Sequence, residues 1–241
     1  MSGPEHDPDV WASGMTVSAM FLFGSHARGD EDIFSDTDLL LISEGDRPQH
    51  VQKGHLSTSI YPLDDLLRRA RDGDLFVCHI AREAKAIYDP TDQLNLLRDH
   101  FVLRASYKQE ITQASDLGWF IVDFGHESHL QSLLNRRIAW CVRTILIAKS
   151  AELKRPVFAA AELAAFAESS DVLKLIKNKE TDRSDPEALA MLGSFLSKFG
   201  AGRFQPGKSS YGAYVKRFSE TSNSVALSLI KAEALSETFD Y

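Results

Sequence analysis

Cysteine is scarce in this chain. The 241 residues include two cysteines, Cys78 and Cys141. They are far apart in the sequence and each lies among apolar neighbours, so we predict two buried, reduced thiols and no disulfide framework. A reducing, cytoplasmic setting fits this expectation.

Long apolar runs are also missing. No stretch of the sequence reaches the roughly 18 consecutive apolar residues that mark a membrane-spanning helix. The first residues are polar, contain Pro4 and Pro8, and lack the apolar core of a signal peptide. We therefore expect no membrane partner.

Positive charge is in the minority. Lys and Arg number 27 against 34 Asp and Glu, which gives a formal net charge of -7. Non-specific binding to a nucleic-acid backbone depends on neutralising phosphates with Lys and Arg, so this balance argues against it without excluding a local basic groove. The remaining composition, 44% hydrophobic and 25% charged, is that of an ordinary soluble domain.

The hydrophobic pattern changes character along the chain. Strand-like apolar runs are confined to the first part, at residues 16–23, 37–43, 55–61 and 86–88. Beyond them, a 3.6-residue period dominates and predicts helices, among them 106–125, 127–151 and one last helix from residue 211 onward. We therefore predict an α+β protein. Residues 1–92 would form a small mixed-sheet domain, and residues 93–241 an all-α helical bundle.

Two apolar runs in the first part enclose the most informative stretch. The first run breaks at Gly24-Ser25, and the second is opened by Asp36-Thr37-Asp38. Side chains at positions i and i+2 of a strand point to the same face, so Asp36 and Asp38 should project together. Mg²⁺ is commonly bound by one or two carboxylates plus substrate phosphates. The Gly-Ser turn can supply backbone N–H groups and a hydroxyl to phosphate oxygens, so the stretch predicts a metal–phosphate site.

The order Phe23-Gly-Ser-His-Ala-Arg-Gly29, then Ser35-Asp-Thr-Asp-Leu39, resembles the signature of the DNA polymerase β-like nucleotidyltransferase superfamily. It looks most like the minimal nucleotidyltransferases and the aminoglycoside-adenylyltransferase-like proteins. The resemblance implies that Gly24 and Ser25 bind the phosphates of ATP or another nucleoside triphosphate. It also implies that Asp36 and Asp38 bind Mg²⁺, in a site that could hold two metal ions. Arg28 would either contact the phosphates or hold the loop by pairing with an acid.

One position departs from the family pattern. Relatives usually carry a third carboxylate in the next strand, and laying Leu56-Ser-Thr-Ser-Ile-Tyr61 on that form puts Ser57 in its place. Three explanations stay open. The protein lacks normal transferase activity, an acid from elsewhere fills the role, or the alignment is shifted. Asp64 and Asp65, just past the strand, are the nearest acids, although they also suit the first turn of a helix.

The second half offers only weak candidates for chemistry. Glu127, Asp116 and Asp123 could each act as a general base, and His126 with His129 is a weak metal motif. No Arg-x4–6-His ribonuclease motif occurs there, so the helical half is interpreted as a substrate or partner domain rather than a fused toxin.

The leading hypothesis is a Mg²⁺-dependent transferase that moves a nucleoside monophosphate, AMP from ATP in the first instance, to a hydroxyl of a protein, an RNA or a small molecule. The alternative is a catalytically impaired module that binds a nucleotide or a partner, such as a pseudoenzyme or an antitoxin-like protein. A third hypothesis is an adenylyltransferase that acts on a small, cationic acceptor molecule. The sequence leaves the acceptor and the oligomeric state open.

Overall fold

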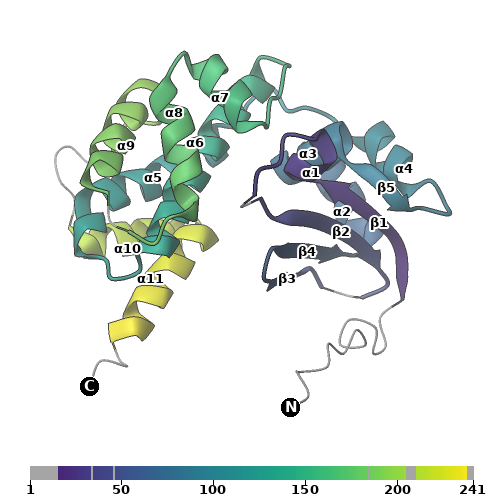
Figure 1. Cartoon of the computed structure of the whole chain (residues 1–241), viewed down its shortest axis with the longest axis horizontal. Coiled ribbons are helices and arrows are strands. Elements are labelled where there is room, and N and C mark those ends of the chain that lie inside the picture. The colour runs from purple at the N-terminus through teal and green to yellow at the C-terminus, as the bar shows by residue number, and fades with distance from the viewer. Residues whose placement is uncertain (1–15, 34, 46, 184, 205–209, 238–241) are drawn as a thin grey trace. The chain divides into compact units, whose positions relative to one another are not determined.

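The computed structural model describes residues 16–33, 35–45, 47–183, 185–204 and 210–237 (Figure 1). The chain divides into two compact units after Leu103. This boundary lies beyond the expected one near residue 92, because helix α4 (Gln93–His100) buries Leu94 and Leu97 in the core of the first unit. The first unit contains a mixed sheet, and the described part of the second is helical, which confirms the α+β class.

A five-stranded sheet with the order β3-β4-β2-β1-β5 forms the centre of the first unit. Strands β2 and β4 are parallel, and the other neighbouring pairs are antiparallel. The strand bounds are β1 Val17–Phe23, β2 Thr37–Ser43, β3 Gln49–Lys53, β4 Leu56–Tyr61 and β5 Lys85–Tyr88. Strand β2 has the bounds expected from its apolar run, and β1 begins one residue later than expected.

The third predicted strand, residues 55–61, is confirmed as β4, but the strand that precedes it was not predicted. Residues 49–61 form a hairpin of β3 and β4, which turns at Gly54 with φ +57°. Strand β3 lies at the edge of the sheet, and four of its five residues are exposed. Its sequence therefore lacks the alternation of apolar and polar residues from which a strand is predicted.

Helices cover the face of the sheet that carries the core. Alternate residues of β1 and β2, such as Phe21 and Leu40, point to this face and are fully buried. They pack with residues of α2 (Leu63–Arg71), α3 (Leu75–Glu83) and α4. The carboxylate of Asp74 caps α3 by accepting hydrogen bonds from the backbone N–H groups of Phe76 and Val77. Asp38 lies two residues before Leu40 in β2, and therefore on the same face at the start of the strand.

The second unit is built from the helices α5 to α11, whose bounds are Lys108–Phe124, Gln131–Glu152, Ala160–Ala167, Ser170–Lys177, Pro186–Phe199, Tyr211–Glu220 and Ser224–Glu237, with short 3-10 turns at Gly125–Glu127 and Asn178–Glu180. The expected single last helix was wrong. The chain breaks between α10 and α11, where Ser222 adopts a left-handed conformation with φ +52°. The sequence Asp185-Pro186 is typical of a helix start, with an N-cap followed by proline at the first helical position. The structure agrees, because the carboxylate of Asp185 accepts from the N–H of Glu187 at the start of α9.

Both cysteines are buried and free, as predicted. Burial raises the pKa of the Cys78 thiol to about 12, so this thiol stays protonated at neutral pH. Among the described residues, no helix combines the length and the apolar character that crossing a membrane requires.

Candidate functional site

Gly24 and Asp38 are in close contact at one end of the sheet. Phe23, the last residue of β1, pairs with Asp38 of β2, so the chain enters helix α1 (Gly24–Arg28) directly beside the Asp38 carboxylate. Gly24 has φ +72°, and a Cβ at this position would lie 2.5 Å from Oδ2 of Asp38. Position 24 therefore requires glycine for two reasons. Its backbone is left-handed, and the carboxylate occupies the space that a side chain would need.

Gly29 provides a matched control for this contact. It ends α1 with φ +80°, and nothing lies within 4 Å of a Cβ built there. Both G24A and G29A should lose about 1–2 kcal/mol of stability through backbone strain. Only G24A also forces a methyl group against Asp38, which should add about 1–3 kcal/mol. The free energies of unfolding of the two variants measure the difference, and equal losses would contradict the contact.

Three neighbouring strands bring polar side chains into one row. Asp38 of β2 is in register with Ser57 of β4, and Ser57 is in register with Gln52 of β3. Gln52 also donates a hydrogen bond from Nε2 to Oδ1 of Asp36, over 3.3 Å. Asp36 and Asp38, two residues apart, thus both adjoin the same row of the sheet.

Ser57 occupies the place next to Asp38 where the alignment puts a third acid. In the described part of the chain, no three His, Cys, Asp or Glu side chains are grouped so that they could hold a metal ion. Asp64 and Asp65 follow the opposite end of β4, about 13 Å along the strand at 3.3 Å per residue. Asp65 pairs there with Arg68. The fold therefore separates these two acids from the Ser57 position.

Arg28 is held by carboxylates. Its Nε donates to Asp30 over 3.0 Å, and its Nη1 donates to Glu83 of α3 over 2.5 Å. Two roles were expected for Arg28, and these contacts agree with the second, in which Arg28 holds the loop by pairing with an acid. A direct contact with phosphate stays a prediction and would use Nη2, which takes part in neither pair.

The buried acids of the second unit are engaged in ion pairs. Asp116, with a side chain 1% exposed, accepts from Nε of Arg217 over 2.8 Å. Asp123 accepts from Nη1 of Arg203 over 2.6 Å and from the hydroxyl of Tyr214 over 2.8 Å. Burial raises the pKa of Asp116 against the opposing effect of Arg217. Both acids join α5 to later parts of the chain, which is a structural role and a poor one for a general base.

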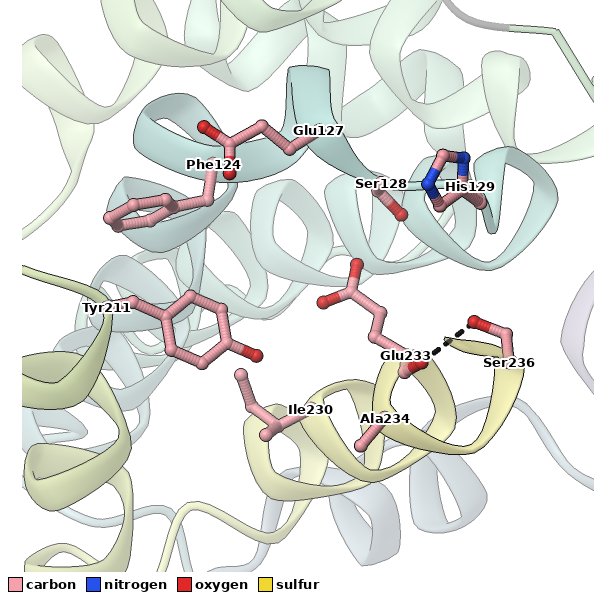
Figure 2. Close-up of a pocket in the computed structure, with 9 residues that line it drawn as sticks. All are labelled: Phe124, Glu127, Ser128, His129, Tyr211, Ile230, Glu233, Ala234 and Ser236. Atoms are coloured by element: carbon pink, nitrogen blue, oxygen red, sulfur yellow. Dashed lines mark hydrogen bonds between the residues drawn. The ribbon is translucent and has the colours of Figure 1, made fainter. Parts of the chain in front are cut away.

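The sequence predicted that a helix begins at Glu127, but Glu127 is not part of α6. It lies in the 3-10 turn before that helix, and its Oε1 is 3.3 Å from Nε2 of His126. Glu127 and His129 line a cavity of about 580 Å³ within the second unit (Figure 2). Tyr211 and Glu233, from α10 and α11, also line it, and the sequence carried no signal that would have joined them to Glu127.

Comparison with known proteins gives one informative match. Residues 11–116 match a family model described as a nucleotidyltransferase domain. This stretch includes Gly24, Ser25, Asp36, Asp38 and Ser57. No curated protein matches the chain. Among solved structures, a nucleotidyltransferase-like protein from Exiguobacterium sibiricum is similar at 15% identity, over 77% of this chain and 70% of that one, with a TM-score of 0.28.

Proposed function

We propose that the protein transfers a nucleoside monophosphate to a hydroxyl group with the help of Mg²⁺. The match of residues 11–116 to a family model of a nucleotidyltransferase domain supports this proposal and the resemblance to the DNA polymerase β-like superfamily. AMP from ATP is the first choice, and the acceptor is a protein, an RNA or a small molecule. The observation that carries the proposal is the position of the Asp38 carboxylate, in direct contact with the space next to Gly24. It puts this carboxylate beside the turn that would bind phosphate.

The side chains at this place fit a divalent metal ion. Mg²⁺ takes oxygen ligands and is usually bound by one or two carboxylates together with waters and substrate phosphates. Asp36 and Asp38 would be those carboxylates. The space above Gly24 that a Cβ would fill is taken by Oδ2 of Asp38, so the carboxylate lies at the turn itself. When bound, the metal ion would stabilise the charges on the attacking and leaving oxygens.

The reaction exchanges one bond to phosphorus for another. The acceptor hydroxyl oxygen forms a bond to the α-phosphorus, the bond from that phosphorus to the bridging oxygen breaks, and pyrophosphate leaves with the electron pair. The backbone N–H groups of the Gly24-Ser25 turn and the Ser25 hydroxyl would bind the β- and γ-phosphates. The hydroxyl proton passes to solvent water, because Ser57, a neutral alcohol, cannot accept it at neutral pH.

Labelled nucleotides test this proposal. The protein is incubated with each of the four α-³²P nucleoside triphosphates, Mg²⁺ and a cell lysate. Label should appear on an acceptor with at least one nucleotide. It should be lost in the D36A/D38A double variant and when EDTA replaces Mg²⁺. With γ-³²P ATP, the protein should add no label to that which the lysate transfers alone, because pyrophosphate leaves. No transfer of α-label from any nucleotide, together with measurable nucleotide binding, would favour the second candidate below.

A catalytically impaired nucleotide-binding or partner-binding module is the second candidate. The register that puts Ser57 directly beside Asp38 favours it, because the third acid of the family pattern would stand there. A hydroxyl is both a weaker metal ligand than a carboxylate and an ineffective base at neutral pH.

Ser57→Asp tests whether the third acid of the family pattern belongs at position 57. A carboxylate beside Asp38 should raise the rate of nucleotidyl transfer by about 100-fold, the lower range of general acid–base effects. S57N, which changes the size of the side chain in the same way without adding a charge, should leave the rate unchanged. The measurement is α-³²P transfer, with thermal unfolding of both variants as the check on folding. If S57D and S57N transferred label at the same rate, the Ser57 position would not be where the missing acid belongs.

A further inference from the structure

Helix α1 is too short to hold its own conformation. It has five residues, Gly24–Arg28, and its N-cap residue, Phe23, makes no side-chain capping hydrogen bond. Isolated helices of this length are unstable in water, because fixing the backbone of the first turn costs more free energy than its hydrogen bond provides. The position of the Gly24-Ser25 turn must therefore be set by contacts from outside α1.

Helix α3 supplies such contacts at the C-terminal end of α1. Figure 1 shows the two helices beside each other at one end of the sheet. Arg28 donates from Nη1 to Oε2 of Glu83 over 2.5 Å, and the two side chains are only 18% and 13% exposed. A charge-assisted hydrogen bond of this kind is among the stronger polar contacts in a protein.

His79 adds a second contact to Glu83. Its Nε2 lies 2.8 Å from Oε2 of Glu83, one turn along α3, and its side chain is 15% exposed. Burial tends to raise the pKa of Glu83, but the bonds to His79 and Arg28 lower it on balance. The carboxylate is therefore charged at neutral pH and binds both partners.

The same histidine reaches the N-terminal end of α1. Its ring packs edge-on against the ring of Phe23, with centroids 5.5 Å apart at an interplanar angle of 88°. Phe23 directly precedes Gly24, and Arg28 is the last residue of α1. Phe23, His79, Glu83 and Arg28 thus connect both ends of α1 to one face of α3.

We propose that Glu83 and His79 are positioning residues, which hold α1 through Arg28 and Phe23 so that the Gly24-Ser25 turn meets the Asp38 carboxylate. This inference rests on the proposed function for its consequence in nucleotide binding, although the attachment itself can be tested without a nucleotide. The effect of positioning should be large, because a displacement of about 1 Å at a reacting group can cost about 100-fold in rate.

The matched control is Asp74. Its carboxylate also pairs with a partly buried arginine, Arg69, over 3.0 Å, and it belongs to the same unit, but it connects α2 to α3 and leaves α1 untouched. Asn is a good N-cap, so D74N removes the charge while it keeps the cap of α3. E83Q and D74N thus make the same chemical change at two places.

Amide hydrogen exchange tests the attachment directly. The N–H groups of Gly29 and Asp30 donate to the carbonyl of Ser25 over 2.8 and 3.2 Å, and they report whether the end of α1 is intact. E83Q should speed exchange at these two amides by about tenfold or more, and D74N should not. H79F, which keeps a ring against Phe23 but loses the bond to Glu83, should give a smaller increase. Unchanged exchange in E83Q would overturn the proposal.

Binding of Mg·ATP, measured by calorimetry, tests the consequence. E83Q should weaken binding by about tenfold, while D74N binds as the wild-type protein does. In the double variant R28Q/E83Q, amide exchange at Gly29 and Asp30 should be as fast as in E83Q alone, because Glu83 acts through Arg28. Equal affinities of E83Q and wild type would overturn the positioning role. A wild-type protein that bound no nucleoside triphosphate would instead remove the proposed function, and hydrogen exchange would still decide the attachment.

Discussion

Asp38→Ala should abolish nucleotidyl transfer, with a loss of about 1,000-fold or more. The variant removes the carboxylate that lies against Gly24 and with it half of the proposed metal-binding pair. Metal ions contribute several kcal/mol of charge stabilisation in such reactions. Each 1.36 kcal/mol corresponds to about a factor of ten in rate, so a loss of about 4 kcal/mol gives this magnitude. D36A should have the same direction of effect.

The control for this prediction is an acid of the same unit with no place in the site. Asp72 has a side chain 66% exposed and pairs with Arg68 on α2, so D72A should transfer label at the wild-type rate. The measurement is the initial rate of α-³²P transfer over a range of Mg²⁺ concentrations, with unfolding curves to verify that D38A is folded. If D38A kept more than a tenth of the wild-type rate with the same Mg²⁺ dependence, Asp38 would not be a metal ligand.

Arg217→Met should destabilise the second unit by about 3–5 kcal/mol, the cost of leaving a buried charge without its partner. Asp116 is 1% exposed and accepts a hydrogen bond from Nε of Arg217 over 2.8 Å. Methionine retains most of the apolar volume of arginine, so the loss should come from the charge. Unfolding can be followed by tryptophan fluorescence, because Trp119 and Trp140 both belong to this unit.

The pH dependence of R217M identifies the charge as the cause. Burial already raises the pKa of Asp116 in the folded wild-type protein above the ordinary value of 3.8, and the loss of Arg217 removes the effect that opposes this rise. A carboxyl with a raised folded pKa contributes stability below its unfolded pKa and loses it as pH rises through the folded pKa. The destabilisation of R217M should thus be smallest in acid and grow toward neutral pH.

A second substitution should relieve the defect. In the double variant D116N/R217M, the buried group is neutral, so at neutral pH the protein should be more stable than R217M alone. A double variant as unstable as R217M, or a loss in R217M that did not change with pH, would show that lost packing rather than the unpaired charge explains the effect.

Local patterns in the sequence decide much of the first unit. The apolar run of β2 predicts its bounds, because a buried strand needs apolar residues at every inward position. The resemblance predicts that Ser57 stands where an acid is expected, and the register puts it beside Asp38. The Asp-Pro pair at the start of α9 predicts where this helix begins, since capping depends only on neighbouring residues. The polar strand β3 cannot be predicted from apolar runs, because an exposed edge strand has no apolar period.

The residues of the proposed site, Gly24-Ser25 and Asp36/Asp38, were predicted from their spacing together with the resemblance to the nucleotidyltransferase signature. What only the tertiary structure decided is how they are supported. Arg28 meets Glu83 55 positions away, and Asp116 meets Arg217 101 positions away. A sequence pattern reports the periodicity of one element. The choice of partner for a charged side chain depends on which elements pack together, and packing is a property of the whole fold.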